Sequence, residues 1–250
     1  MSKARGYCGI VLLILVVLLA GRPAVYSQEQ GLKGLVVGET LGYQVFLKGL
    51  PVGEQTLRIV REKIYQDRPV LEVRMRMRSY AAFAFLFTYE EDNLLYLDIA
   101  TRTPVYLRRT VKEQDHSWEE EFHFGAETVE KRVTTAGEEP EIRQYEAKHP
   151  LLENLSLVYY LRQRPWRQGE KQIYYLTRRG PQAVTCQLRG TERIRVLSGY
   201  QQAEVVYDPV SEVTIWFSKD EAVYPLRIKA NSNVGALTAR LVKISFDPGE

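Results

Sequence analysis

The chain has 250 residues, 45% of them hydrophobic and 26% charged, so it is long enough to bury a core of its own. It carries 34 Lys and Arg against 31 Asp and Glu, and three of the basic residues lie in the first 27 positions, which contain no acidic residue. The remainder is therefore neutral. Because a nucleic-acid-binding protein needs a basic excess to neutralise phosphates, we exclude that class.

The first 27 residues have the order of a secretory signal peptide: a basic start, an apolar run from Cys8 to Ala20, a helix-breaking Gly-Arg-Pro and small residues. We predict cleavage near Ser27, a periplasmic location, and a flexible N-terminus over residues 28–34. An uncleaved membrane anchor is the alternative, but a spanning helix needs about 20 apolar residues. A lipoprotein fits less well, since Cys8 stands at the start of the apolar run.

Alternation of apolar and polar residues predicts a single β domain over residues 35–247. The clearest strand has Leu71, Val73, Met75 and Met77 on one face and charged residues on the other. So many strands cannot form one flat sheet, and we predict a large curled antiparallel sheet or a β-barrel-like domain. The expected strands span residues 41–47, 56–60, 71–78, 83–89, 94–98, 105–111, 118–124, 128–133, 172–177, 183–190, 203–207, 213–218, 226–230 and 236–246.

One segment departs from this alternation. Leu151, Leu155 and Val158 recur at helical spacing, which predicts one short helix at about residues 151–164 that joins two β halves. Asn154 or Ser156 is the expected N-cap, and Arg164-Pro165 is the expected end. The polar stretch over residues 135–140 is expected to be a mobile loop.

Several motifs stand out along the chain. They are, in chain order, Gly38-Glu39-Thr40-Leu41-Gly42-Tyr43, Gly49-Leu50-Pro51-Val52-Gly53, Tyr96-Leu97-Asp98 with Thr103-Pro104, Leu155-Ser156-Leu157-Val158-Tyr159-Tyr160-Leu161-Arg162, and Trp216-Phe217-Ser218-Lys219-Asp220 with Tyr224-Pro225-Leu226-Arg227. These motifs resemble those of a family of exported bacterial proteins known as domain of unknown function 3108. The resemblance covers residues 35–243 and implies a periplasmic β fold. It implies no role for any residue, because the family has no established activity.

We predict neither a metal site nor a cofactor. His116 and His123 flank three glutamates, but residues of opposite parity point to opposite faces of a strand and cannot share an ion. We expect a solvated acidic face here, opposite a core face of Trp118, Phe122 and Phe124.

No catalytic residue is predicted either. The chain has no Gly-x-Ser-x-Gly or Ser-x-x-Lys motif, and Cys186 alternates with apolar residues as a core position does. A Cys186 that is alone after cleavage can form no disulfide within the chain. Asp220 and Glu221 are expected to form an exposed turn.

The weak candidates for ligand binding are Met75, Met77, Phe83, Phe85 and Phe87. The two methionines are the only ones left after cleavage, and a pair of these adaptable side chains suits a surface that accepts apolar ligands. Ordinary core packing is the alternative for this stripe. On the opposite face, Arg74, Arg76 and Arg78 are expected to pair with an acidic strand such as the one with Glu119 and Glu121.

These observations favour a periplasmic, non-catalytic binding module for a lipid or other amphiphile. A structural or assembly partner of another envelope protein, docking through an open sheet edge, is the alternative. A hydrolase is the third possibility.

Overall fold

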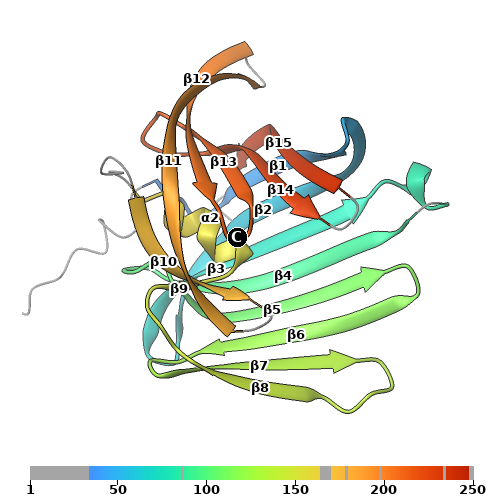
Figure 1. The fold of residues 1–250 in the computed structure, drawn as a ribbon, viewed down its shortest axis with the longest axis vertical. Helices are drawn as coiled ribbons and strands as arrows, with labels where there is room; N and C mark the ends of the chain where they lie inside the picture. Colours follow the sequence, from blue (N-terminus) through green and yellow to red (C-terminus); the bar gives the residue numbers. More distant parts are fainter. Residues whose placement is uncertain are drawn as a thin grey trace, which may run out of the picture.

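The computed structural model describes residues 34–85, 87–163, 170–177, 180–196, 199–232 and 235–247. Within these residues, every strand belongs to one 15-stranded sheet with the order β8-β7-β6-β5-β4-β3-β2-β1-β15-β14-β13-β12-β11-β10-β9 (Figure 1). The predicted signal peptide and most of the predicted flexible N-terminus lie outside the described residues. The strands are β1 (Glu39–Leu47), β2 (Leu50–Tyr65), β3 (Arg68–Ser79), β4 (Tyr89–Asp98), β5 (Pro104–Glu113), β6 (His116–Phe124), β7 (Thr128–Thr135), β8 (Glu141–Glu146), β9 (Leu151–Leu152), β10 (Glu170–Thr177), β11 (Gly180–Val196), β12 (Gly199–Asp208), β13 (Val213–Ser218), β14 (Pro225–Ser232) and β15 (Gly235–Phe246).

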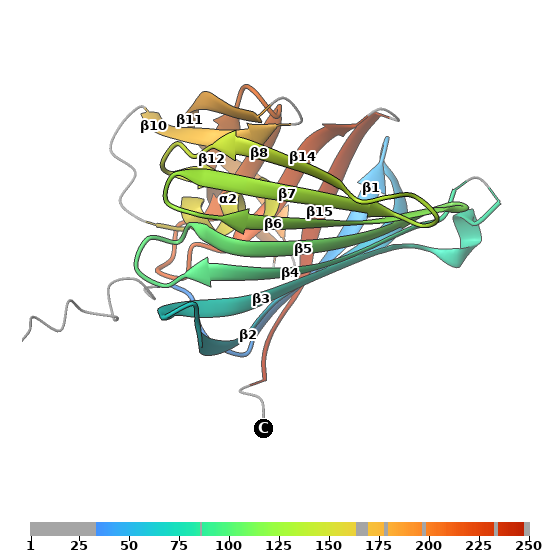
Figure 2. The same cartoon turned by 90° about the horizontal axis from the view of Figure 1, so that it is seen from below.

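The sheet is a long meander that curls on itself, which confirms the predicted fold class. Chain neighbours pair as antiparallel hairpins from β1 to β8 and from β10 to β15, and β1 pairs antiparallel with β15, so the two ends of the domain meet in the middle of the sheet. Only β9 and β10 run parallel among the described pairs. Figure 2 shows β2 to β8 as one wall, with β10 to β12 brought round above β8.

A glycine allows the two ends of the curled sheet to approach each other. Gly180 opens β11 at φ 105°, and a Cβ placed on it would lie 3.1 Å from a ring carbon of Tyr145 on β8. Any side chain here would be strained in its backbone and would press on that ring. Strand β8, at the edge of the first half of the sheet (β1 to β8), therefore packs against β11 of the second half (β9 to β15). The described residues of these two strands form no ladder of hydrogen bonds with each other.

The helix α2 (Asn154–Leu161) lies inside the curl, between the two halves. Leu155 and Tyr159 belong to a core cluster that spans both halves of the sheet, whereas Leu157 and Leu161 belong to a second cluster within the second half. A helix buried on all sides needs no polar face, which explains its run of apolar residues. None of the helices in the described part of the chain has the length and apolar composition that crossing a bilayer requires.

The predicted helix began too early and had the wrong cap. Leu151–Leu152 form β9, which pairs with Tyr174 and Tyr175. The prediction was wrong here because two leucines fit a strand as well as the turn of a helix. Glu153 is the N-cap, and its carboxylate accepts the backbone N–H groups of Leu155 and Ser156, while the Ser156 hydroxyl accepts the Glu153 N–H. The predicted end at residues 164–165 lies outside the described residues.

Three strand predictions needed correction. The turns Lys48-Gly49 and Gln66-Asp67 have positive φ at both positions, as in tight two-residue hairpins, so β2 is much longer than residues 56–60. The loop predicted over residues 135–140 links the end of β7 to β8, a strand that alternation did not reveal because all but one of its side chains are exposed. The expected strand over residues 83–89 is instead a 3-10 turn, η1 (Ala81–Phe83), and a loop that precedes β4.

The arginine ladder on β3 faces outward, but it pairs with neighbours other than those expected. Arg76 reaches Asp92 at 2.7 Å and Arg78 reaches Glu90 at 3.9 Å, both on β4, while Arg74 reaches Glu72 on its own strand at 3.0 Å. Strand β6, with Glu119 and Glu121, lies three places away in the sheet order. Residue alternation gives the face of a strand but not its neighbour.

A fully buried ion pair ties the end of α2 to the start of β1. The guanidinium of Arg162 donates to both carboxylate oxygens of Glu39, at 2.6 and 2.8 Å, and its remaining N–H groups donate to the carbonyls of Gly34 and Ala222. The two side chains are 0% and 1% exposed. Burial alone would lower the pKa of Arg162, but Glu39 outweighs that effect and raises it.

Candidate functional site

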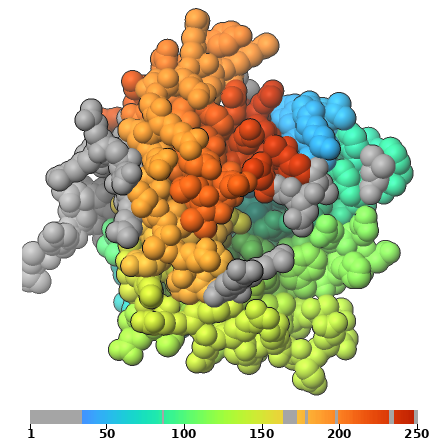
Figure 3. Space-filling model, in the orientation of Figure 1, coloured from blue at the N-terminus to red at the C-terminus, as the bar shows by residue number. Residues whose placement is uncertain are grey.

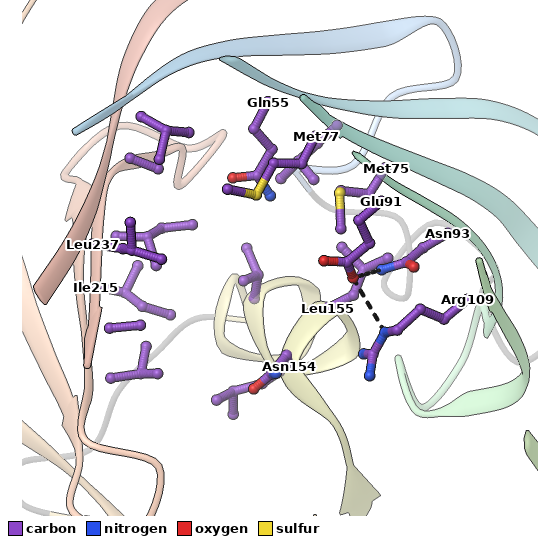
Figure 4. Close-up of a pocket in the computed structure, with 18 residues that line it drawn as sticks. Gln55, Met75, Met77, Glu91, Asn93, Arg109, Asn154, Leu155, Ile215 and Leu237 are labelled. Carbon is purple, nitrogen blue, oxygen red and sulfur yellow. Dashed lines mark hydrogen bonds and ion pairs between the residues drawn. The ribbon is translucent and has the colours of Figure 1, made fainter. Parts of the chain in front are cut away.

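A cavity of about 230 Å³ lies between α2 and the inner faces of both halves of the sheet (Figure 4). Alternation along β2, β3 and β15 turns Gln55, Met75, Met77 and Leu237 inward. Leu155 on α2 and Ile215 on β13 also line the cavity, and both are labelled in Figure 4. The apolar side chains come from sequence-distant strands that only the curl of the sheet brings together.

Two further hollows adjoin this cavity. One of about 540 Å³ shares Met77, Glu91 and Leu237 with it, and one of about 410 Å³ shares Glu91, Arg109 and Asn154 with it. Glu91 lines all three. Figure 3 shows the recess between the orange-red strands of the second half and the green strands of the first half. The interior is therefore a branched space and not a solid core.

An ion cluster stands where the three hollows meet. Arg109 on β5 reaches Glu91 at 3.2 Å, Glu120 at 3.1 Å and the helix cap Glu153 at 3.3 Å. Glu120 also accepts from Lys131 at 2.6 Å. The side chains of all five are between 6% and 19% exposed, so this charge lies mostly out of water. We call these five residues the interior ion cluster.

The interior ion cluster changes the acidity of its members. Burial alone would lower the pKa of Arg109, but the carboxylates of Glu91, Glu153 and Glu120 outweigh it and raise that pKa. Burial raises the pKa of Glu120, yet Lys131 and Arg109 outweigh it and lower that pKa. Arg109 and Glu120 are therefore both charged near neutral pH.

Tyrosines extend the cluster toward the cavity walls. The Tyr89 hydroxyl donates to Glu91 at 2.6 Å, and burial together with that carboxylate raises the Tyr89 pKa. The amide of Asn93 donates to the same carboxylate at 2.9 Å, and Tyr175 donates to Asn154 at the start of α2. Each oxygen of Glu91 is thus already hydrogen-bonded within the protein.

The structure brings together three of the five predicted ligand-binding residues. Met75, which is buried, and Met77, which is half-buried, line the 230 Å³ cavity, and Phe87 lines the 540 Å³ hollow. Phe83 lies outside that lining and stacks on Phe87 with ring centroids 6.2 Å apart. Phe85 is 80% exposed and does not line the cavity, because it follows the 3-10 turn Ala81–Phe83, where the alternation of a strand does not apply.

Because Phe85 is exposed and Met75 is buried, the two truncations Phe85→Ala and Met75→Ala should have different effects on the free energy of unfolding. Phe85→Ala should change the free energy of unfolding by less than about 0.5 kcal/mol, since an exposed side chain loses few contacts. Met75→Ala should cost less than the roughly 2–5 kcal/mol of a fully packed site, because one side of Met75 already faces a hollow. Urea unfolding of both variants measures this. A full-size loss for Met75→Ala would mean that the wall is packed in solution.

The histidines of β6 are not placed to share a metal ion. His123 faces outward beside Tyr106, with ring centroids 5.1 Å apart, whereas Phe122 and Phe124 are buried on the inner face. In the described part of the chain, no three His, Cys, Asp or Glu residues converge as metal ligands would. The absence of a bound metal stays a prediction.

Two other candidate groups have structural roles. Cys186 is 0% exposed and packs in the core of the second half. Asp220 accepts hydrogen bonds from the Ser218 hydroxyl and the Val223 N–H, so it shapes the turn between β13 and β14. The sequence analysis likewise predicted a turn at Asp220 and Glu221.

The interior ion cluster is the part of the site that residue patterns did not reveal. Glu120 shares the parity of Trp118 and of the core residue Phe122, yet no role was predicted for it. Arg109 likewise shares the parity of Leu107 and Val111, which are both buried. A charged residue at an inward position of a strand was the signal that could have indicated this cluster.

Comparison with known proteins gives a family and a fold but no activity. The family model described as "Protein of unknown function (DUF3108)" matches residues 42–242. No curated protein matches the chain. The chain is similar to a β-barrel-like protein of domain of unknown function DUF1849 from Brucella abortus, with a TM-score of 0.52 and 8% identity over 85% of this chain and 98% of that chain.

A second solved structure is a more distant likeness. It is a protein from Bacteroides fragilis that is assigned to the exported proteins and has a YmcC-like fold. The TM-score is 0.36, with 7% identity over 84% of this chain and 96% of that one. At such identities, the first likeness speaks for the fold alone.

Proposed function

Because the chain belongs to the DUF3108 family, whose name assigns no activity, we propose a function from the site: a non-catalytic binding module for a lipid or other amphiphile of the cell envelope. The observation that carries the proposal is the branched interior space, whose walls are mostly apolar with a few polar side chains among them. An amphiphile likewise combines hydrocarbon with a polar group. The order of residues 1–27 supports a periplasmic location for this module.

The apolar part of the space has the properties of a site for flexible hydrocarbon. Small-molecule sites typically enclose about 300–1,000 Å³ with apolar walls and a few polar groups, and the 540 Å³ hollow lies in that range. Met75 and Met77 can change rotamer to fit different chains at small cost. The cavity beside them connects the hollow to the helix and to the second half of the sheet.

The carboxylates of the interior are better explained by structure than by catalysis. A general acid or base needs a lone pair or proton that can reach a substrate. Glu91 is hydrogen-bonded to Tyr89 and Asn93, Glu120 is paired with Lys131, and Glu153 caps α2. These contacts support the assignment as a binding protein.

Docking of a partner on a sheet edge is the second candidate, and β8 is the observation that favours it. Its outer edge has no strand beside it in the sheet order, and Ile142 is 51% exposed. However, Glu141, Arg143 and Glu146 alternate charges along this short strand, which is how proteins protect an edge from pairing. We therefore rank edge docking below ligand binding.

Native mass spectrometry of the protein purified from its own periplasm tests the proposal. We expect a bound mass that is released on denaturation. The purified protein should also take up the apolar probe N-phenylnaphthylamine saturably. Met77→Trp, which fills the junction of two hollows, should weaken that uptake at least about tenfold.

The matched control is Phe85→Trp, because Phe85 is exposed and lines none of the three hollows. It should bind the probe as the wild type does. If the wild type carries no ligand and shows no saturable uptake, the binding proposal is wrong and edge docking becomes the better candidate.

A further inference from the structure

The interior offers no free charge to a ligand. Arg109 is shared among Glu91, Glu120 and Glu153, and Lys131 is paired with Glu120. Three carboxylates against two cations leave the interior ion cluster with one surplus negative charge. Arg78 and Glu113, one of each sign, also line the 540 Å³ hollow and leave this balance unchanged.

An anionic ligand head would therefore meet an unfavourable field. To bind Arg109 it would have to displace one carboxylate and would still lie beside the other two. Charges that are mostly removed from water interact strongly, so this repulsion is not screened as it would be at the surface.

A cationic head gains little from the same cluster. The oxygens of Glu91 already accept from Tyr89 and Asn93 and are ion-paired with Arg109, and those of Glu153 accept from two backbone N–H groups and from Arg109. A cation that entered the cavity would lose its hydration without an unoccupied carboxylate to replace it.

Two neutral amides in the cavity wall have unused hydrogen-bonding capacity among the described residues. The buried Oδ1 of Asn93 accepts no hydrogen bond, so it offers an acceptor alone, whereas Gln55 offers more. Gln55 on β2 points into the cavity beside Met77, its cross-strand partner (Figure 4). Its amide makes no hydrogen bond with any described residue, although most side chains around it are apolar. An amide offers both a donor and an acceptor, which suits a hydroxyl, ester or amide of a ligand.

From these observations, and resting on the proposed function, we propose that the cavity selects an uncharged amphiphile whose neutral polar group hydrogen-bonds to Gln55. The interior ion cluster acts as a charge filter, since its own cations are fully paired. Free fatty acids and other anionic single-chain lipids are excluded by the same arrangement. The polar group of the ligand would lie near β2 and β3, and its hydrocarbon would lie against the methionines.

Three probes of equal chain length test this proposal: decanol, decanoate and decylammonium, each displacing N-phenylnaphthylamine near neutral pH. Decanol should compete at least about tenfold more strongly than either charged probe. Tighter binding of decanoate or of decylammonium would overturn the neutral selection while leaving the binding function intact. Failure of N-phenylnaphthylamine itself to bind saturably would instead contradict the proposed function.

The role of Gln55 is tested by Gln55→Leu, which keeps the size of the side chain and removes the amide. Decanol affinity should fall about fivefold, as expected for one hydrogen bond, while the affinity for N-phenylnaphthylamine stays unchanged. The control is Thr56→Leu, because the next residue on β2 is exposed on the outer face. Equal losses for both probes in Gln55→Leu would indicate a merely structural role, and unchanged decanol affinity would remove Gln55 from the proposal.

Discussion

Replacement of Arg162 by methionine is expected to lower the free energy of unfolding by about 3–5 kcal/mol, one of the two largest losses that we predict for a single substitution in this protein. Methionine keeps much of the aliphatic length but carries no charge. It leaves the Glu39 carboxylate buried, at 1% exposure, without its cation. It also removes the donors to the carbonyls of Gly34 and Ala222.

The position of Arg162 in the chain explains why the effect should be global. It is the C-cap residue of α2, and its partner Glu39 opens β1, 123 residues earlier. The same guanidinium contacts the turn between β13 and β14 through Ala222. One side chain therefore joins the helix, the middle of the sheet and the second half.

The double variant Glu39→Gln/Arg162→Met separates loss of the pair from loss of packing. If the penalty comes mainly from an isolated buried carboxylate, the double variant should lose less than the sum of the two single variants. Urea unfolding of all three measures the coupling. Arg76→Met is the surface control, since its exposed pair with Asp92 should contribute only about 0–1 kcal/mol. Strict additivity would contradict the assignment of the penalty to the carboxylate.

Alternation along the sequence was enough to predict the fold class and most strand faces. Leu41, Tyr43 and Val45 were expected to share a face, and all three are buried. The bounds predicted for β13, Val213–Ser218, were correct, although its last four residues are all buried. Such local patterns work because burial on one face of a strand imposes the same period at every position.

Contacts between distant segments were not predictable in the same way. Arg162 follows an apolar helix and resembles an ordinary polar C-terminal residue, and only the fold reveals that Glu39 lies opposite it. The strand predicted over residues 83–89 was wrong for another reason: three phenylalanines at alternate positions imitate the pattern of a strand. Local pattern cannot distinguish a strand from a turn that happens to have the same spacing.

Arg109→Met is the second substitution for which we expect a loss of about 3–5 kcal/mol near neutral pH. It leaves Glu91, Glu120 and Glu153 close together in the interior with Lys131 as the one remaining cation of the interior ion cluster. Glu153 would still cap α2 through its hydrogen bonds to Leu155 and Ser156, so the helix should persist. The matched control is Arg108→Met, since the preceding residue on β5 is exposed.

The loss in Arg109→Met should shrink as the pH falls, which distinguishes it from simple loss of packing. In the wild type the pKa of Glu120 is lowered, because Lys131 and Arg109 outweigh its burial, so its contribution to stability is present above the unfolded pKa and is lost on acidification. Without Arg109, mutual repulsion and burial should raise the carboxyl pKa values above their unfolded value of about 4.3. A raised pKa means that the folded variant binds more protons than the unfolded one, so lowering the pH stabilises it. Between about pH 7 and about pH 5, urea unfolding should therefore show the difference between variant and wild type narrowing, and a difference independent of pH would show that the three carboxylates do not interact.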